Sequence, residues 1–482
     1  MKTIFQSFTL GAILSISSLG FAASDIQSLL AQQHSSSRGK IGTSQCAAEF
    51  SRNTATLRNI VAEGNVLADM TMNGKEIIEA SFRQRLDLLK VLKETTLSKG
   101  KVSGDCEKAF RKYVNARRLF EEYTALNANL NESPEIFEGN SPNLLVNPNY
   151  GKFALKSGDI LVSRGTAVVS ATIAKIGDQE GMYSHAAMVY VDPKTSDIYL
   201  MQSEIETGVE AELIGENYLR DGKIRANVYR PKDAKLAANA AKWMFDYIAS
   251  VKAKGSYIRY NFSMDFSKED LMFCSQMPFM AYQKASDNKF LLGATYKTTF
   301  VERKNRSFLN GLKITVPSTY SPNDVELDEK LELVAEWRDL SRAGKAHRRD
   351  AVMDSIFTWM DEEGYNFNKA YNSLESTLLV GLRNAPITGK FLSSSIADNI
   401  EQQQLKYFLT MNTIGGAALE SYVEKEEALY KDAIPSYAQM LRLMVEVKKD
   451  DLNRLAQERE YNENGLTYPA TYESRFMKYL SR

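Results

Sequence analysis

Apolar residues recur at helical spacing through residues 44–130. Phe82, Leu86 and Leu89 are spaced i, i+4 and i+7, which places them on one face of a helix. Four more residues repeat this theme further along the chain: Phe110, Tyr113, Val114 and Phe120. Two glycines separate the two stretches and favour a break between helices. The pattern therefore predicts a helical hairpin region over 44–130.

Short apolar runs replace the helical periodicity in residues 151–322. Runs of apolar and β-branched residues predict strands at 159–163, 186–191, 198–201 and 224–230. Helical patterns follow at 232–253 and at about 274–285. This mixture predicts an α+β domain over 151–322. The three prolines of residues 131–150 predict a linker between this domain and the hairpin region.

The remaining parts of the chain give simpler patterns. Residues 323–482 return to helical spacing and predict a C-terminal helical domain, with one apolar stripe formed by Val352, Ile356, Trp359 and Met360. A basic cluster within it is expected to form a solvated face: Lys345, His347, Arg348 and Arg349. Residues 23–43 are rich in serine and glutamine and predict a flexible lead-in.

The first 22 residues have the order of a secretory signal peptide. Lys2 precedes the largely apolar stretch Ile4–Leu19, and the small residues Gly20 and Ala22 suit a signal peptidase. We therefore expect cleavage near Ala22 and a periplasmic or secreted mature protein. The alternative is an uncleaved membrane anchor, but polar residues interrupt the apolar stretch and argue against a stable span.

Composition excludes several classes of function. Sixty basic residues balance sixty acidic ones, which gives no support to nucleic-acid binding or to a polybasic membrane contact. The chain has no glycine-rich phosphate loop and neither of the CxxC and HExxH spacings that bind zinc. With three histidines in 482 residues, a histidine-rich metal site is not expected either. We expect no cofactor and no metal.

The three cysteines divide into a pair and a single thiol. Cys46 and Cys106 both lie in the predicted hairpin region, where two adjacent helices would bring them together. In an oxidising compartment such a pair is expected to form a disulfide. Cys274 stands alone far downstream. It is either a cysteine nucleophile or a buried, inert core residue.

Four motifs in the α+β region point to a known group of hydrolases. The first two are Gly158–Val162 and Tyr183–Val189, the latter containing Ser184-His185. The third and fourth are Tyr260–Phe266 and Phe273–Met277, the latter containing Cys274-Ser275-Gln276, and Ala281-Tyr282 follows. In this order they resemble the permuted papain-like hydrolases of the NlpC-type superfamily, the YiiX/YebB-like group. The resemblance covers about 155–322, roughly a third of the chain, and implies a permuted papain-like domain with no bearing on the flanking helical regions.

The resemblance implies roles for individual residues. Cys274 would be the nucleophile and His185 its base. A helix beginning near Cys274 would favour the thiolate, since a helix N-terminus attracts negative charge. A third polar group should orient the histidine, and the sequence offers Gln202 or Glu204 at strand period two. We favour Glu204, because a carboxylate better stabilises an imidazolium.

Two positions depart from the pattern of the group, and both concern substrate choice. Asn261 stands where the group has an aspartate, and Gln276 stands where it has a glutamate. The expected activity is hydrolysis of an amide in a peptide or an N-acyl amino acid, with peptidoglycan stem peptides as a periplasmic candidate. A lipid acyl hydrolase or acyltransferase using the same thiol is the second reading, and a non-catalytic ligand- or partner-binding protein is the third.

Overall fold

The computed structural model describes residues 25–60, 64–130, 143–214, 223–368, 397–431, 433–466, 469 and 473–482. The predicted signal peptide at 1–22 lies outside these residues. None of the helices within the described ranges combines the length and the apolar character needed to cross a bilayer. The described chain is a mixture of helices and strands, in agreement with the expected α+β class.

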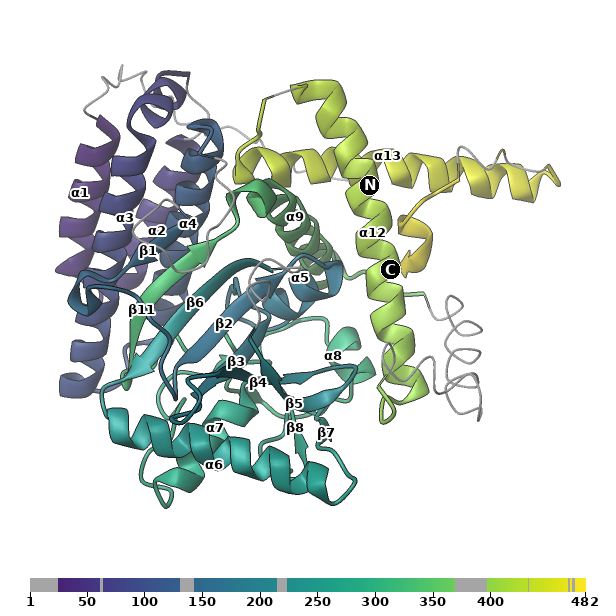
Figure 1. The fold of residues 1–482 in the computed structure, drawn as a ribbon. Coiled ribbons are helices and arrows are strands. Elements are labelled where there is room, and N and C mark those ends of the chain that lie inside the picture. The colour runs from purple at the N-terminus through teal and green to yellow at the C-terminus, as the bar shows by residue number, and fades with distance from the viewer. Residues whose placement is uncertain are drawn as a thin grey trace.

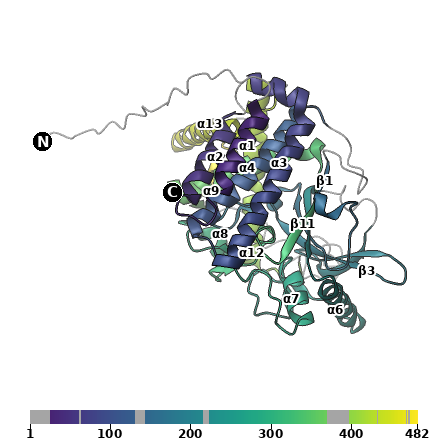
Figure 2. The same cartoon turned by 90° about the vertical axis from the view of Figure 1, so that its left-hand side faces the viewer.

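Four helices form the N-terminal part of the molecule (Figures 1 and 2): α1 Asp25–Arg38, α2 Cys46–Ile60, α3 Gly64–Lys99 and α4 Gly104–Asn127. The flexible lead-in predicted at 23–43 is wrong for the described residues, because α1 packs against α3. Ile26 and Leu30, one helical turn apart, are both buried there. Gln27, Ser28, Gln32 and Ser35 lie on the exposed side of this amphipathic helix, whereas Gln33 and Ser37 continue the buried stripe.

A disulfide fastens α2 to α4. Cys46 and Cys106 are bonded, with their Cα atoms 5.2 Å apart, and both side chains are buried. Cys46 is the first residue of α2. Cys106 lies in the first turn of α4, where its amide donates to the side chain of the capping residue Ser103. The pairing predicted from the sequence is confirmed.

Removal of this disulfide should destabilise the protein measurably. We expect Cys46→Ala/Cys106→Ala to lower the free energy of unfolding by about 2–4 kcal/mol, because the bond closes a long loop in the unfolded chain. Urea unfolding followed by circular dichroism measures the difference. Dithiothreitol should weaken the wild type and leave the double variant unchanged. A wild type that ignores the reductant and matches the variant would show that the bond contributes nothing.

A seven-stranded antiparallel sheet forms the centre, in the order β1-β11-β6-β2-β3-β4-β5. Its strands are β1 Leu144–Val146, β2 Ile160–Gly165, β3 His185–Val191, β4 Ile198–Glu204, β5 Gly208–Leu213, β6 Lys223–Pro231 and β11 Leu331–Arg338. Two of them correct the expected domain limits. β1 lies within the predicted linker, and β11 lies within the predicted C-terminal helical domain, yet both pair into this sheet.

Helices cover one face of the sheet: α5 Val168–Lys175, α6 Ala234–Ala253 and α7 Gln276–Ala285. Ala186 and Met188 of β3 share an apolar cluster with residues of α6 and α7. Ala187 and Val189 belong to a separate cluster on the opposite face, which also includes Phe153. The two clusters follow from the alternation of side chains along a strand.

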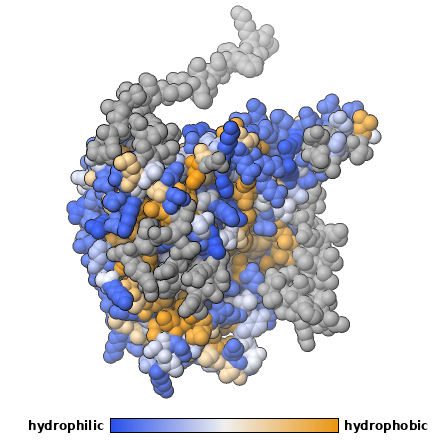
Figure 3. All heavy atoms as spheres, turned by 45° about the horizontal axis from the view of Figure 1, so that its top comes forward, coloured by the Kyte–Doolittle hydropathy of each residue, from blue (hydrophilic) through white to orange (hydrophobic). Residues whose placement is uncertain are grey.

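The C-terminal part is helical: α9 Leu340–Glu363, α12 Gln402–Tyr430 and α13 Tyr437–Glu463. α9 packs against α4, α5, α12 and α13, so it connects the three parts of the fold. The far end of α13 projects away from the other elements (Figure 1), and its surface is mostly hydrophilic (Figure 3). The part of the chain that the structure describes also has short elements: η1 Pro148–Tyr150, β7 Arg259–Tyr260, β8 Leu271–Met272, β9 Thr298–Thr299, α8 Ser307–Gly311, β10 Ser318–Thr319, β12 Asn366–Phe367, η3 Met477–Tyr479 and β13 Leu480–Ser481.

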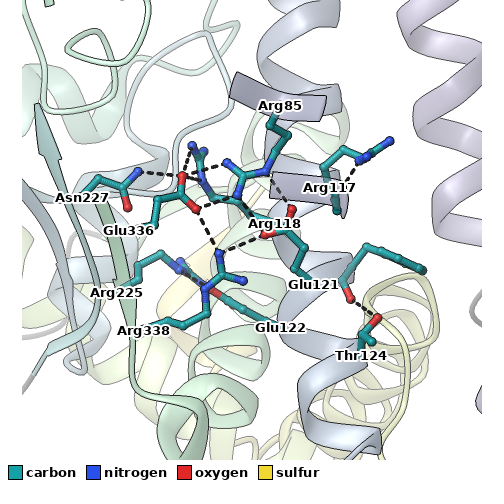
Figure 4. Close-up of polar contacts among 12 residues, drawn as sticks. Arg85, Arg117, Arg118, Glu121, Glu122, Thr124, Arg225, Asn227, Glu336 and Arg338 are labelled. Carbon is teal, nitrogen blue, oxygen red and sulfur yellow. Dashed lines mark hydrogen bonds and ion pairs between the residues drawn. The ribbon is translucent and has the colours of Figure 1, made fainter. Parts of the chain in front are cut away.

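Buried charges join the N-terminal helices to the sheet (Figure 4). Glu336 of β11 accepts hydrogen bonds from Arg85 of α3 at 2.6 Å and from Arg118 of α4 at 2.9 Å. Arg338 donates to Glu336 at 3.0 Å and to Glu121 of α4 at 2.9 Å. These side chains are almost completely buried. The helices and the sheet therefore meet through ion pairs, which must stay matched because an unpaired buried charge is costly.

The basic cluster expected to form a solvated face is only partly exposed. His347 is buried, and its Nε2 lies 2.6 Å from Glu122 of α4, which also accepts two hydrogen bonds from Arg225 of β6. Arg348 pairs with Glu426 of α12. The prediction of a solvated face fails because α9 is enclosed by neighbouring helices, a feature that local charge does not reveal.

Candidate functional site

A chain of hydrogen bonds holds His185 at the start of β3. Its Nε2 lies 3.0 Å from Oε1 of Gln202 on β4, and Nε2 of Gln202 donates to Glu212 of β5 at 3.1 Å. Because Gln202 gives its NH2 group to Glu212, its oxygen faces the ring and accepts from Nε2–H. The neutral imidazole then has Nδ1 as its proton acceptor. Burial, followed by the positive charge of Lys223, lowers the pKa of His185 to about 4.

Cys274 lies directly before the N-terminus of α7. Ser275 is the N-cap of this helix, and its hydroxyl donates to the backbone oxygen of Tyr320 at 2.6 Å. Cys274 is the free cysteine of the described chain and is 6% exposed. Burial raises the pKa of its thiol to about 11, while the backbone N–H groups of Ala186 and Ser275 act in the opposite direction. The sulfur therefore lies against the amide of the residue that follows His185.

The fold brings Cys274 and His185 to the same strand end but does not join them. Both residues are described, and no hydrogen bond between them is present. His185 and Ala187 are two residues apart on β3, so they lie on the same face of the sheet, where His185 bonds Gln202. α7 packs on the opposite face, which is the face of Ala186. The imidazole and the thiol thus approach the start of β3 from different sides.

Gln202, and not Glu204, contacts the histidine, so the preference for Glu204 is corrected. The paired part of β3 and β4 ends at Ala187 and Gln202, and Glu204 lies two residues beyond it, where β4 pairs with β5 alone. Burial and the nearby carboxylates Glu212 and Glu206 raise the pKa of Glu204. The carboxylate at the end of the hydrogen-bond chain from His185 is instead Glu212, which the sequence motifs did not single out.

The two departures from the motif pattern contact each other. Asn261 donates to Oε1 of Gln276 at 3.0 Å, and the same oxygen accepts from the amide of Phe273. Gln276 in turn donates to the backbone oxygen of Lys268. Both amide side chains are buried. They fix the loop that precedes Cys274, and as neutral groups they avoid placing two carboxylates together in the interior.

A narrow pocket opens beside Cys274. Apolar residues form much of its lining, from the end of α5 and from the segments around the cysteine: Ile173, Ala174, Ile176, Met264, Phe273 and Phe300. Tyr260, Thr298, Thr319 and Asn323 add polar groups. An apolar pocket with a few polar groups suits a small acyl or side-chain group placed next to the sulfur.

Neither His34 nor a metal-binding cluster extends the site within the described residues. The ring of His34 lies on α1, where its Nε2 is 2.8 Å from Asp87, far along the chain from the motifs. Within the described ranges, no group of three or more histidine, cysteine or acidic side chains is arranged to hold a metal ion.

Comparisons with known proteins return no relative. No protein family matches the chain, and none of the curated proteins or solved structures matches it.

Proposed function

We propose that the chain is a cysteine hydrolase that cleaves amide bonds through a thioester on Cys274. The observation that carries the proposal is the position of the single free thiol, at a helix N-terminus and against the backbone beside a histidine held by Gln202 and Glu212. A nucleophile, a base and a group that orients the base are the parts such chemistry needs. The ordered motifs shared with permuted papain-like hydrolases also support it.

The proposed reaction has two steps. Nδ1 of His185 takes the thiol proton as the sulfur attacks the carbonyl carbon, and the imidazolium then gives that proton to the departing amine. Water next attacks the thioester, with His185 again taking a proton, which releases the acid and restores the thiol. The amides of Ser275 and Ala186, which lie against the sulfur, would donate to the oxyanion. Because no hydrogen bond joins the two residues at rest, the side chain of His185 must turn toward the sulfur when substrate binds.

The pocket beside Cys274 is also compatible with a second substrate class, acyl esters, cleaved by the same chemistry. Its apolar lining and its volume of about 30 Å³ suit a short acyl group as well as a small apolar amino-acid side chain. An ester or lipid acyl substrate would give the same thioester on Cys274. Peptide, N-acyl amino acid and acyl ester substrates should therefore be compared in one assay.

Acylation of Cys274 and its pH dependence test the proposal. During turnover, acid quenching followed by peptide mass spectrometry should find the acyl group on Cys274. If His185 is the base, the acylation rate should stay level through neutral pH and fall as the pH drops through about 4, where His185 becomes protonated. A rate that rises about tenfold per pH unit up to the thiol pKa would mean that the thiolate reacts without a base. Absence of acylation with every substrate class would favour a binding protein.

A further inference from the structure

β5 forms an edge of the central sheet, and some of its outward backbone amides have no backbone partner within the described ranges. The amide of Ile214 donates to the backbone oxygen of Ile198 in β4, so even-numbered amides here face inward and odd-numbered ones face outward. Val209 follows this rule, because its amide donates outward to Ile258. For the outward amides of Ala211 and Leu213, no backbone partner exists among the residues that the structure describes. An open strand edge of this kind is a template for an added strand.

A groove of about 800 Å³ runs between this edge and α6. Val209 and Ala211 of β5 face Phe245 and Ile248 of α6 across it. The ring of Phe245 is fixed by stacking on Tyr190, with ring centroids 4.4 Å apart. Two exposed apolar side chains flank the same region: Leu213, 61% exposed, and Tyr257, 47% exposed. The floor of the groove is therefore apolar, rigid and open to solvent.

The rim of the groove is acidic. Glu206, Glu210 and Glu212 line it and outnumber the single lysine of the lining, Lys252, whose charge acts on Glu210. None of the three forms a salt bridge with a described residue. Burial raises the pKa of Glu210, and its hydrogen bond with Glu212 raises it further. Glu210 and Glu212 alternate with Val209 and Ala211, so carboxylates and apolar side chains occupy opposite faces of β5. A ligand that adds a strand here would meet apolar groups on one face and negative charge on the other.

We propose that this groove binds an extended peptide, with alternating apolar and basic residues, as an additional strand on β5. Main-chain hydrogen bonds to Ala211 and Leu213 would supply affinity, and alternate side chains would supply selectivity. The apolar residues face α6 and the basic residues face Glu210 and Glu212. The proposal rests on the proposed function in one respect: the peptide is the substrate, because Glu212 connects through Gln202 to His185.

Binding to the full-length Cys274→Ala protein tests the groove separately from catalysis. The probes are fluorescein-labelled, N-acetylated octapeptides that alternate valine with lysine, serine or glutamate, and fluorescence anisotropy measures their affinity. The lysine peptide should bind most tightly. Ala211→Pro removes one outward amide at an edge position where proline is tolerated, and Glu210→Lys reverses one charge. Each should weaken binding of the lysine peptide about tenfold or more. Glu76→Lys, an exposed position on α3, is the matched control and should change nothing.

The outcomes separate the two proposals. Equal binding of all three peptides, or full affinity in a folded Ala211→Pro protein, would overturn the groove. Selective binding of the lysine peptide supports the groove even if the wild type never cleaves it, and that combination would overturn only the statement that this peptide is the substrate. Cleavage of the lysine peptide by the wild type, with KM raised by Ala211→Pro and kcat little changed, would support both.

Discussion

Cys274→Ala should abolish acylation and turnover, because no other side chain beside the sulfur can form the thioester. His185→Ala should lower kcat by about 10²–10⁴-fold, since the thiol would lose its proton acceptor. Gln202→Ala should be damaging as well, because the ring would lose the bond that holds Nε2 and keeps Nδ1 free. Glu204→Gln should leave activity nearly unchanged, as Glu204 does not contact the ring. Steady-state kinetics on the best substrate of the panel measures all four.

Paired variants make the ranking specific. Gln202→Glu keeps the length of the side chain and its acceptor oxygen but replaces the donor to Glu212 by a second carboxyl group, so these two groups would share a proton. It should still retain more activity than Gln202→Ala. A carboxylate at this position would also stabilise the imidazolium and raise the pKa of His185, which moves the acid limb of the pH profile upward. A severe loss in Glu204→Gln together with a neutral Gln202→Ala would show that the order derived from the hydrogen bonds is reversed. Full activity in Cys274→Ala would remove the covalent mechanism.

The choice between Gln202 and Glu204 shows where sequence reasoning stops. Both side chains lie on one face of β4, as the period of a strand requires, and the sequence narrowed the orienting group to these two. The preference for Glu204 rested on charge. The strand register favours Gln202 instead, because the pairing of β3 with β4 ends at Gln202. Glu212 is reached only through the next hairpin, so no local motif identified it.

The N-terminal and C-terminal limits of the central domain were missed for a related reason. Leu331, Leu333, Ala335 and Trp337 have the period of a strand. The intervening residues are polar except for Val334, and this signal was available within a region that otherwise has helical spacing. The pairing of that strand with β6 and β1 joins segments far apart in the chain. In contrast, the cysteine pair was predictable, since two cysteines in neighbouring helices needed only the hairpin to meet.

Net charge gave no sign of the buried ion pairs between the helices and the sheet. Equal numbers of acidic and basic residues are compatible both with charges spread over the surface and with charges paired in the interior. The sequence around Arg85 has the pattern of an ordinary amphipathic helix, which would place this arginine on the surface. Its side chain is instead completely buried against Glu121 and Glu336. Such matching depends on the docking of α3 and α4 on β11, which is a property of the whole fold.

Glu336→Ala should therefore be the most destabilising of the substitutions considered. The carboxylate of Glu336 accepts hydrogen bonds from three arginines, Arg85, Arg118 and Arg338, and from Asn227. Its removal leaves buried guanidinium groups without their shared partner, and we expect a loss of about 3–5 kcal/mol in the free energy of unfolding. Urea unfolding measures it. Glu79→Ala, which removes a partly exposed carboxylate 3.8 Å from Arg83, is the control and should cost at most about 0.5 kcal/mol.

The pH dependence of unfolding distinguishes the lost charge from the lost volume. Burial alone would raise the pKa of Glu336, but Arg118 and Arg85 outweigh it and hold the pKa well below its ordinary value of 4.5. A group with a depressed pKa stabilises the fold fully above its unfolded pKa and loses that contribution as the pH falls. The wild type should thus lose its advantage over Glu336→Gln progressively below about pH 4.5. A constant difference between the two proteins from pH 7 to pH 3 would contradict an ionised Glu336 at the junction of the helices and the sheet.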